Sequence, residues 1–240
     1  MGFPITAVVL AGGRGTRIAE LYPDTPKPMV PVCGRPFLYW VTDWLVGQGV
    51  TDIVYSTGYR AEQIELWAKD AGRHWDIGLR WTRESTPLGT GGGVLQCLPL
   101  CAGHVLVVNG DSLTPVGLSP LIARARNCDG ALLGVKMADA ARYGTLTLDE
   151  SGRLLKFAEK RPGAGIINAG LYLLSRSLLE GFPRNRKLSM EEEVMPDLIA
   201  QGVNLSCEVA ENAPFLDIGT PESVAQAEGF IRRHFHATDL

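Results

Sequence analysis

Residues 5–17 read ITAVVLAGGRGTR, an apolar run that ends in three glycines within four residues. The continuous apolar run at 5–10 predicts a strand buried on both faces, as in parallel sheets. Glycines after such a strand let backbone N–H groups approach an anion closely, because no side chain stands in the way. Since Arg14, Arg17 and Lys27 add positive charge around this loop, we expect it to bind a polyphosphate.

Two common phosphate-binding motifs do not match this loop. The P-loop ends in Gly-Lys-Ser/Thr, and no Lys-Ser/Thr pair follows these glycines. The dinucleotide fingerprint needs a third glycine after Gly13 and Gly15, at a position where this chain has Ile18. A plain turn between a strand and a helix is the structural alternative. The nearby arginines and the Pro-Lys-Pro at 26–28 favour a binding loop over that alternative.

The composition is that of an ordinary globular chain of 240 residues, with 45% hydrophobic and 20% charged residues. A net charge of −3 argues against a general nucleic-acid binder, which usually carries a basic field. The five cysteines match no common zinc spacing, so we expect reduced and mostly buried thiols. We see no signal peptide and no apolar run of membrane-spanning length, and therefore expect a cytoplasmic protein without a membrane partner.

Predicted strands alternate with predicted helices along the first half of the chain. Strands are expected at 5–10, 52–57, 79–84, 104–111 and 130–137. One helix is expected to begin at Pro36, two others to span 61–71 and 118–127, and a fourth to run from an N-cap at Thr90 to residue 98. This alternation predicts an α/β fold of the Rossmann-like kind, a mostly parallel sheet flanked by helices. We expect a single domain over residues 1–240.

The second half of the chain shows a different pattern. Two strands are expected at 143–148 and 154–160, joined by a turn at 149–152, and the first alternates polar and apolar residues. They predict a small antiparallel insertion facing the substrate, within a subregion at about 139–175. A further strand at 166–174 contains a glycine, which marks a bulge or a close approach. Ser189 and the glutamates after it match a capping box and are interpreted as structural, and Thr220 is expected to cap the last helix.

Two further segments follow predicted strands and are candidate binding elements. The strand at 104–111 ends in Asn-Gly-Asp, and the stretch STPLGTGGG at 85–93 follows the strand at 79–84. Ligands of parallel α/β sheets bind outside the carboxyl ends of the strands. Magnesium takes one or two carboxylates with phosphate oxygens and water, so Asp111 can begin a metal site, although an aspartate there can also simply cap a loop.

The motifs LxGGxGTR at 10–17 and PKP at 26–28 resemble the signature of sugar-1-phosphate nucleotidyltransferases, and the resemblance continues in the family's order to Pro221. It implies attack of a sugar 1-phosphate on the α-phosphorus of a nucleoside triphosphate, with release of pyrophosphate. It assigns catalysis to Arg17, Lys27 and Asp111, and magnesium to Asp111 and Asp217. The implied nucleotide-binding residues are Leu10, Ala11, Gly12, Gly13, Gly15, Thr16, Glu84, Pro87, Gly89, Thr90 and Gly110. The implied sugar-phosphate residues are Tyr143, Gly144, Glu159, Lys160, Asn168 and Gly170.

Within the family, these motifs look most like the D-glycero-α-D-manno-heptose 1-phosphate guanylyltransferases, which make GDP-heptose for bacterial cell-surface glycans. The resemblance therefore implies GTP and heptose 1-phosphate as substrates and Mg²⁺ as cofactor. A short mannose-1-phosphate guanylyltransferase and an N-acetylmuramate 1-phosphate uridylyltransferase are the alternatives within the family. Because the last predicted helix starts near the end of the sequence, we expect no left-handed β-helix extension of the kind found in longer members.

Two hypotheses come from other classes. A regulatory subunit that binds sugar nucleotides without catalysis would be expected to lose charged site residues, whereas Lys27, Asp111 and Asp217 are all present. A glycosyltransferase would usually carry an Asp-x-Asp metal motif, which Asp111-Ser-Leu does not supply. The sequence leaves the state of association open, with a homo-oligomer as one option.

Overall fold

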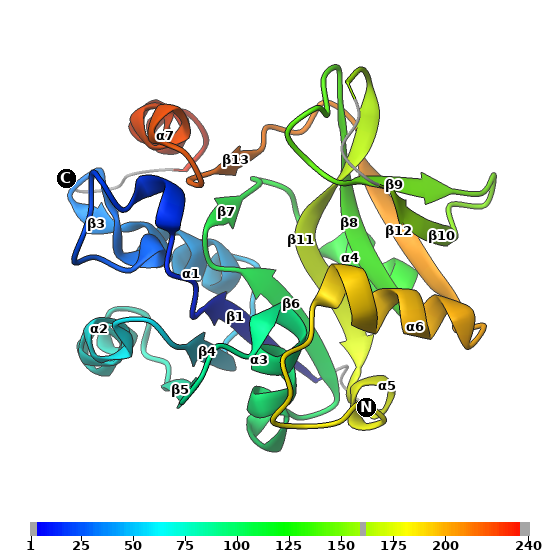
Figure 1. Cartoon of the computed structure of the whole chain (residues 1–240), viewed down its shortest axis with the longest axis horizontal. Coiled ribbons are helices and arrows are strands. Elements are labelled where there is room, and N and C mark those ends of the chain that lie inside the picture. The colour runs from blue at the N-terminus through cyan, green and yellow to red at the C-terminus, as the bar shows by residue number, and fades with distance from the viewer. Residues whose placement is uncertain (1–3, 159–161, 236–240) are drawn as a thin grey trace.

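The structure is a computed structural model that describes residues 4–158 and 162–235. Within these residues, nine strands form one mixed sheet at the centre of the molecule (Figure 1). The strands are β1 (Ile5–Ala11), β4 (Ile53–Thr57), β5 (Leu79–Arg83), β6 (His104–Asn109), β8 (Gly130–Met137), β9 (Thr145–Leu148), β10 (Leu154–Ala158), β11 (Gly165–Ser175) and β12 (Leu205–Ala210).

The sheet is parallel over most of its width. β1 lies between β4 and β6 and is parallel to both, and β5 extends the parallel arrangement beyond β4. β11 is antiparallel to β6 on one side and to β8 on the other, while β12 is parallel to β8. Seven of the nine strands, β5, β4, β1, β6, β8, β12 and β9, therefore point the same way, and β11 and β10 run against them. The predicted, mostly parallel α/β sheet is confirmed.

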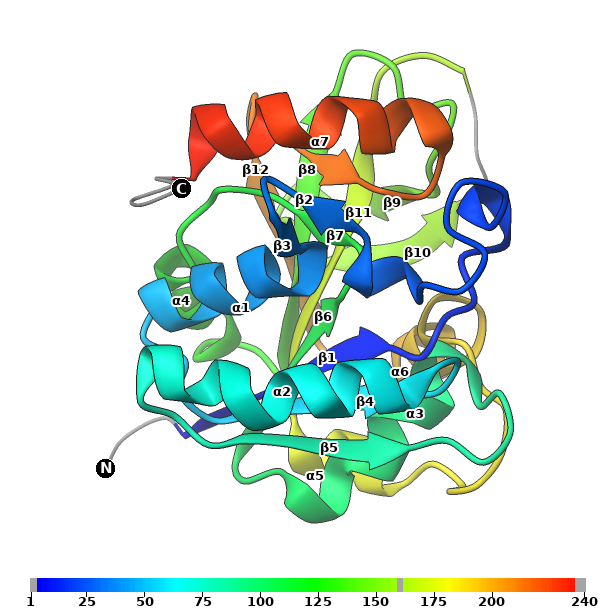
Figure 2. The same cartoon turned by 90° about the vertical axis from the view of Figure 1, so that its left-hand side faces the viewer.

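Helices cover both faces of the sheet. They are α1 (Phe37–Gly47), α2 (Ala61–Trp75), α3 (Gly89–Cys97), α4 (Ser119–Ala125), α5 (Arg176–Glu180), α6 (Met195–Ala200) and α7 (Pro221–His234). Successive residues of a strand point to opposite faces. Accordingly, Val9 belongs to the core under α1, α2, α4 and α7, and Val8 to the core under α3, α5 and α6. Figure 2 shows α7, α1 and α2 in front of the sheet.

Short elements connect these layers. They are the 3₁₀ turns η1 (Thr16–Ile18), η2 (Lys27–Met29) and η3 (Leu98–Leu100), the π-helical turn η4 (Met190–Val194), and the two-residue strands β2 (Pro31–Val32), β3 (Arg35–Pro36), β7 (Ser112–Leu113) and β13 (Leu216–Asp217). β7 pairs with β13, which places the segment after β6 beside the segment before α7.

The aromatic residues of α1 are part of the core, as their helical spacing predicts. Phe37 is fully buried, and Trp40 and Trp44 are nearly so. The indole N–H of Trp40 donates to the carbonyl of Val32 at 3.0 Å, and that of Trp44 to the carbonyl of Val116 at 3.2 Å. Both indoles therefore bury their apolar surface without leaving an N–H group unpaired.

The predicted antiparallel insertion is confirmed as β9 and β10, and β9 is shorter than expected. β9 begins at Thr145, where it meets Ile167 of β11, and β10 is described as far as Ala158. The predicted end of this strand, at 159–160, lies outside the described residues. The pairing of β11 with β8 shifts register between Asn168 and Tyr172, and Gly170, at φ +73°, lies within this shift. The glycine therefore marks the bulge that its place in a strand predicts.

The prediction that Thr90 caps the helix after the second glycine-rich stretch is wrong. α3 begins one residue earlier, at Gly89, and Thr90 lies inside its first turn. The carbonyl of Leu188 accepts hydrogen bonds from the N–H groups of Gly91 at 2.8 Å and Gly92 at 3.3 Å. A backbone segment about 100 residues away thus satisfies donors that a side chain usually satisfies at a helix start.

The remaining expectations concern thiols and membranes. All five cysteines are free, four of them buried and Cys128 half-buried, which confirms the expectation of reduced and mostly buried thiols. None of the helices described here is long and apolar enough to cross a membrane. The predicted N-cap of the last helix is confirmed, because the Thr220 hydroxyl accepts from the N–H group of Ser223.

The close packing of Leu188 on α3 predicts the effect of adding a methyl group there. A Cβ at Gly92 would lie 2.5 Å from the carbonyl oxygen of Arg186, which is backbone and cannot rotate away. We expect Gly92→Ala to lower the free energy of unfolding by about 1–3 kcal/mol. Gly47→Ala, at the end of α1 with no atom within 4 Å, should leave it unchanged or raise it by up to about 1 kcal/mol. Urea unfolding of both variants measures this, and equal effects would contradict the packing argument.

Candidate functional site

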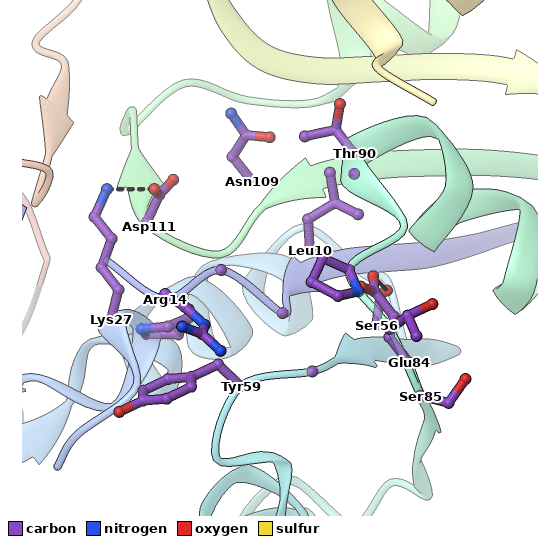
Figure 3. Close-up of a pocket in the computed structure, with 17 residues that line it drawn as sticks. Leu10, Arg14, Lys27, Ser56, Tyr59, Glu84, Ser85, Thr90, Asn109 and Asp111 are labelled. Carbon is purple, nitrogen blue, oxygen red and sulfur yellow. Dashed lines mark hydrogen bonds and ion pairs between the residues drawn. The ribbon is translucent and has the colours of Figure 1, made fainter. Parts of the chain in front are cut away.

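The carboxyl ends of β1, β4, β5 and β6 surround a cavity of about 510 Å³ (Figure 3). This edge of a parallel sheet is where ligands of α/β folds bind. Nine residues predicted for the site line the cavity: Leu10, Gly12, Gly13, Lys27, Glu84, Pro87, Gly89, Thr90 and Asp111. The loops after four different strands therefore converge on one cavity, and three of these loops carry the motifs singled out in the sequence.

Glycines let the loops after β1 and β4 approach at the base of the cavity. A Cβ at Gly58 would lie 2.9 Å from the carbonyl oxygen of Gly12. The same carbonyl accepts a hydrogen bond from the N–H group of Tyr59 at 3.1 Å. Any side chain at Gly58 would force these backbones apart, so the glycine is needed for the shape of the cavity.

Glu84 supplies a fixed carboxylate to the cavity. Its Oε2 accepts from the N–H group of Leu88 at 2.9 Å, and its Oε1 accepts from the hydroxyl of Ser56 at 3.4 Å. A Cβ at Gly93 would lie 2.8 Å from Oε1, so the carboxylate lies directly against α3. Burial raises the pKa of Glu84 above its ordinary value, although both hydrogen bonds act in the opposite direction. The site thus holds a half-buried hydrogen-bond acceptor.

Lys27 and Asp111 form an ion pair at the other end of the cavity (Figure 3). The Lys27 side chain is 13% exposed and the Asp111 side chain is 34% exposed. A Cβ at Gly15, where φ is +62°, would lie only 2.9 Å from the Cβ of Lys27. Gly15 therefore has a packing role: its missing side chain leaves room for the lysine to reach Asp111.

Asp217 lies on the strand that pairs with the segment after Asp111. The N–H group of Ile218 donates to the carbonyl of Asp111 at 2.9 Å. The carboxylate of Asp217 accepts from the hydroxyl of Tyr143 at 2.5 Å and lies 3.5 Å from the guanidinium of Arg142. Burial and this hydrogen bond raise the pKa of Tyr143 to about 12, so its hydroxyl is a stable donor at neutral pH. The predicted residues Asp111, Asp217 and Tyr143 are thus brought together.

The donor set around these two aspartates fits a hard cation better than a soft one. A Cβ at Gly219 would lie 2.5 Å from Oδ1 of Asp217 and 3.2 Å from Nζ of Lys27, so carboxylate and amine converge on this glycine. Across residues 4–158 and 162–235, no three His, Cys, Asp or Glu side chains gather as a metal-binding group. Two carboxylates alone suit magnesium, which completes its octahedron with phosphate oxygens and water.

The predicted sugar-side residues that the structure describes are linked to this cavity through Gly170 and to Asp217 through Tyr143. The side-chain oxygen of Asn168 accepts from the N–H group of Gly170 at 3.0 Å. The backbone N–H group of Asn168 donates to the carbonyl of Gly144 at 3.4 Å. A Cβ at Gly170 would lie 2.3 Å from Nδ2 of Asn109, a residue that lines the cavity. Asn109 therefore connects the cavity to the bulge of β11. Glu159 and Lys160, also predicted here, lie outside the described residues.

Some predicted residues lie outside the cavity lining. Arg17 and Thr16 are exposed in η1, and Ala11 is buried within β1. Gly110 is a close-approach position, because a Cβ there would lie 2.6 Å from the carbonyl oxygen of Leu10. Gly110 and Ala11 thus belong to the strand ends beside the cavity, while Arg17 is exposed and is not among the residues that line it.

The sequence assigns Tyr59 no role and gives Arg14 only a general one, as positive charge around a loop expected to bind a polyphosphate. Arg14 was noted only for its charge, yet it lines the cavity and lies over the Tyr59 ring, with its guanidinium carbon 5.5 Å from the ring centroid. The Tyr59 hydroxyl donates to the carbonyl of Pro23 at 3.2 Å, which fixes the ring. Tyr59 and Asn109 share one recognisable signal, since each lies at the carboxyl end of a parallel strand.

Comparison with known proteins gives one family. The family model described as Nucleotidyl transferase matches residues 6–234. D-glycero-α-D-manno-heptose 1-phosphate guanylyltransferase of Campylobacter jejuni is 33% identical over 218 residues, covering 90% of this chain and 95% of that protein. Mannose-1-phosphate guanylyltransferase of Mycobacterium tuberculosis is 32% identical over 237 residues, 95% of this chain, which spans only 65% of that protein. The crystal structure of HddC from Yersinia pseudotuberculosis complexed with GMP-PN has a TM-score of 0.84 at 34% identity, covering 95% and 99% of the two chains.

The raised pKa of Glu84 predicts a pH-dependent stability. The fold disfavours the ionised carboxylate, so the contribution of Glu84 to the free energy of unfolding falls as pH rises through its folded-state pKa. We expect Glu84→Gln, which keeps an acceptor for the N–H group of Leu88, to have a higher Tm than the wild type at pH 7. The gain should shrink as pH falls toward 4. Thermal unfolding across this range measures it, with the exposed Glu192→Gln as control, and a gain independent of pH would refute the argument.

Proposed function

Because the chain belongs to the nucleotidyl transferase family, we propose that it transfers a guanylyl group from GTP to D-glycero-α-D-manno-heptose 1-phosphate. The products are GDP-heptose, a sugar nucleotide for cell-surface polysaccharide, and pyrophosphate. The Campylobacter relative is named for this guanylyl transfer to the heptose 1-phosphate, and it matches this chain over 90% of the chain's length. The mycobacterial relative favours mannose 1-phosphate as a second candidate acceptor. We place the reaction in the cytoplasm, where nucleoside triphosphates are available.

The observation that carries this proposal is the pairing of a glycine-rich loop with Lys27 and Asp111 at one cavity edge. The loop can offer backbone N–H groups to a triphosphate, and Lys27 can neutralise charge on its phosphates. We assign Arg17, which follows the glycine-rich loop in the sequence, to the same role, and Arg14 adds a cation on the cavity wall. An anion-binding edge of this kind, beside a base-sized cavity, suits a nucleoside triphosphate.

Glu84 supports guanine as the base. Guanine presents two adjacent N–H donors on its Watson–Crick edge, which a single carboxylate can accept together. Uracil and thymine present one such donor, and adenine presents a donor beside an acceptor. The carboxylate of Glu84 is half-buried in the cavity and already oriented by Leu88 and Ser56. A wrong base would leave a buried polar group unpaired, at a cost of about 1–3 kcal/mol.

The reaction needs no general base, because the attacking phosphate oxygen is already an anion. A bond forms between this oxygen and the α-phosphorus of GTP, while the bond from the α-phosphorus to pyrophosphate breaks. Catalysis is then positioning together with charge neutralisation. Asp111 and Asp217 would hold Mg²⁺, which would neutralise charge on the phosphates when bound. Lys27 stabilises the charge that develops on the departing pyrophosphate.

We assign the acceptor to the subregion at about 139–175, within one nucleotidyltransferase domain over residues 1–240. Tyr143, Gly144, Asn168 and Gly170 gather beside the metal aspartates and Asn109. Hydroxyl, amide and backbone groups of this kind suit the hydroxyls of a sugar. Glu159 and Lys160, which follow β10, are proposed to hold the sugar hydroxyls and the phosphate.

Removing one charge of the ion pair should nearly abolish turnover. We expect Lys27→Ala and Asp111→Asn each to lower kcat by about 10²–10³-fold, the loss typical of one preorganised charged or donor group. Lys136→Ala is the matched control, because its amine pairs with Glu211 on the surface and its side chain is 54% exposed. Steady-state pyrophosphate release measures all three variants, with circular dichroism to establish folding. Near-wild-type rates in folded Lys27→Ala would refute the proposed role of this residue.

A substrate grid tests the function itself. Pyrophosphate release with Mg²⁺ is measured for GTP, ATP, CTP, UTP and dTTP against heptose, mannose, glucose and N-acetylmuramate 1-phosphates. We expect the highest kcat/KM for GTP with the heptose. A maximum elsewhere in the grid would keep the reaction class and refute the substrate, with mannose 1-phosphate as the second candidate. Nucleotide binding without turnover anywhere would favour a regulatory, non-catalytic subunit.

A further inference from the structure

A chain of hydrogen bonds connects the sugar side of the proposed site to the nucleotide side. It begins at Asn168 on β11, whose Nδ2 donates to the hydroxyl of Tyr172 at 2.5 Å. The Tyr172 hydroxyl donates to Oε1 of Glu191 at 2.9 Å. Oε2 of Glu191 accepts from the hydroxyl of Thr90 at 3.1 Å, and Thr90 lines the nucleotide cavity. Residues from three separate segments are thus linked through one carboxylate.

The buried part of this chain has a fixed direction. Tyr172 is fully buried, and burial together with the nearby Glu191 raises the pKa of its hydroxyl well above the ordinary value. The phenol therefore stays protonated, donates to Glu191 and accepts from Asn168. Because the Asn168 carbonyl oxygen accepts from the N–H group of Gly170, both ends of this amide are oriented. The orientation of the Asn168 amide depends on Tyr172, and that of Tyr172 on Glu191.

The other end of this chain of hydrogen bonds is Thr90, in the first turn of α3. The Thr90 hydroxyl donates to Glu191 and accepts from the N–H group of Met190 at 2.8 Å. It is therefore engaged by the segment of Leu188 to Glu191, whose Leu188 carbonyl also accepts from the first turn of α3. The glutamates after Ser189 were interpreted as a capping box, and the Ser189 hydroxyl does accept from the N–H group of Glu192 at 3.1 Å. Glu191 has a separate role, because its side chain points at Tyr172 and Thr90.

We propose that Glu191 is a positioning residue, whose carboxylate holds the sugar-side Asn168 and the nucleotide-side Thr90 in register for the transfer. The inference rests on the proposed function, because it assigns Asn168 to the acceptor and Thr90 to the nucleotide. The carboxylate accepts three hydrogen bonds, the third from the Ser189 hydroxyl at 3.2 Å. Each arm of the chain can be cut separately, because Tyr172 and Thr90 use different oxygens of Glu191.

Two variants cut the two arms with little change in shape. Tyr172→Phe removes the hydroxyl that orients Asn168, and we expect it to raise KM for the sugar 1-phosphate about tenfold while KM for GTP stays within about twofold. Thr90→Val removes the hydroxyl that fixes α3, and we expect it to raise KM for GTP about tenfold while KM for the sugar 1-phosphate stays within about twofold. Glu191→Ala should raise both KM values. Glu191→Gln retains one acceptor oxygen and adds a donor, so both of its KM values should lie closer to those of the wild type than to those of Glu191→Ala.

Steady-state kinetics with both substrates varied measure this split, together with thermal unfolding of every variant. Glu192→Gln is the matched control, because Glu192 is exposed and its neighbour carries the proposed role. A purely structural Glu191 would lower Tm and the active fraction without separating the two KM values, and that result would refute the inference while the proposed function stands. A folded wild-type chain that turns over none of the sugar 1-phosphates would refute the proposed function, and this inference with it.

Discussion

The ion pair between Lys27 and Asp111 joins the loop after β1 to the segment after β6, and the site is built around it. The Lys27 side chain is largely shielded from water, so removing Asp111 leaves its charge without compensation. Two glycines leave room for this ion pair, Gly15 beside the aliphatic part of Lys27 and Gly219 beside its amine. In the proposed reaction, Lys27 would pair with the triphosphate in place of Asp111, and the carboxylate of Asp111 would then be available to a cation.

β11 explains how nucleotide and acceptor sides belong to one sheet. Its second half pairs with β6, whose end lines the proposed nucleotide cavity, and its first half meets β9 of the antiparallel insertion. The change of partner falls at Gly170, where the backbone bulges and packs against Asn109. The proposed acceptor region is therefore an extension of the central sheet.

Local patterns in the sequence predicted the strands well, because an apolar run such as 5–10 is readable within a few residues. They also predicted the cavity, since residues at the ends of parallel strands necessarily meet at one edge. Contacts between distant segments were missed for the opposite reason. Nothing near Thr90 indicates that the carbonyl of Leu188 satisfies the start of α3, or that Glu191 accepts from its hydroxyl. The glutamate run was assigned to capping because only its own helix is visible in the sequence.

The most direct test of the account follows the α-phosphorus of GTP. The chain is incubated with Mg²⁺, heptose 1-phosphate and GTP labelled at the α-phosphorus, and the products are separated and counted. Nucleotidyl transfer to the sugar phosphate predicts that the label moves into a species that also contains the sugar, with unlabelled pyrophosphate released in equal amount. Label that appears in GDP or GMP without the sugar would indicate attack at another phosphorus or by water, and would contradict nucleotidyl transfer to the sugar phosphate.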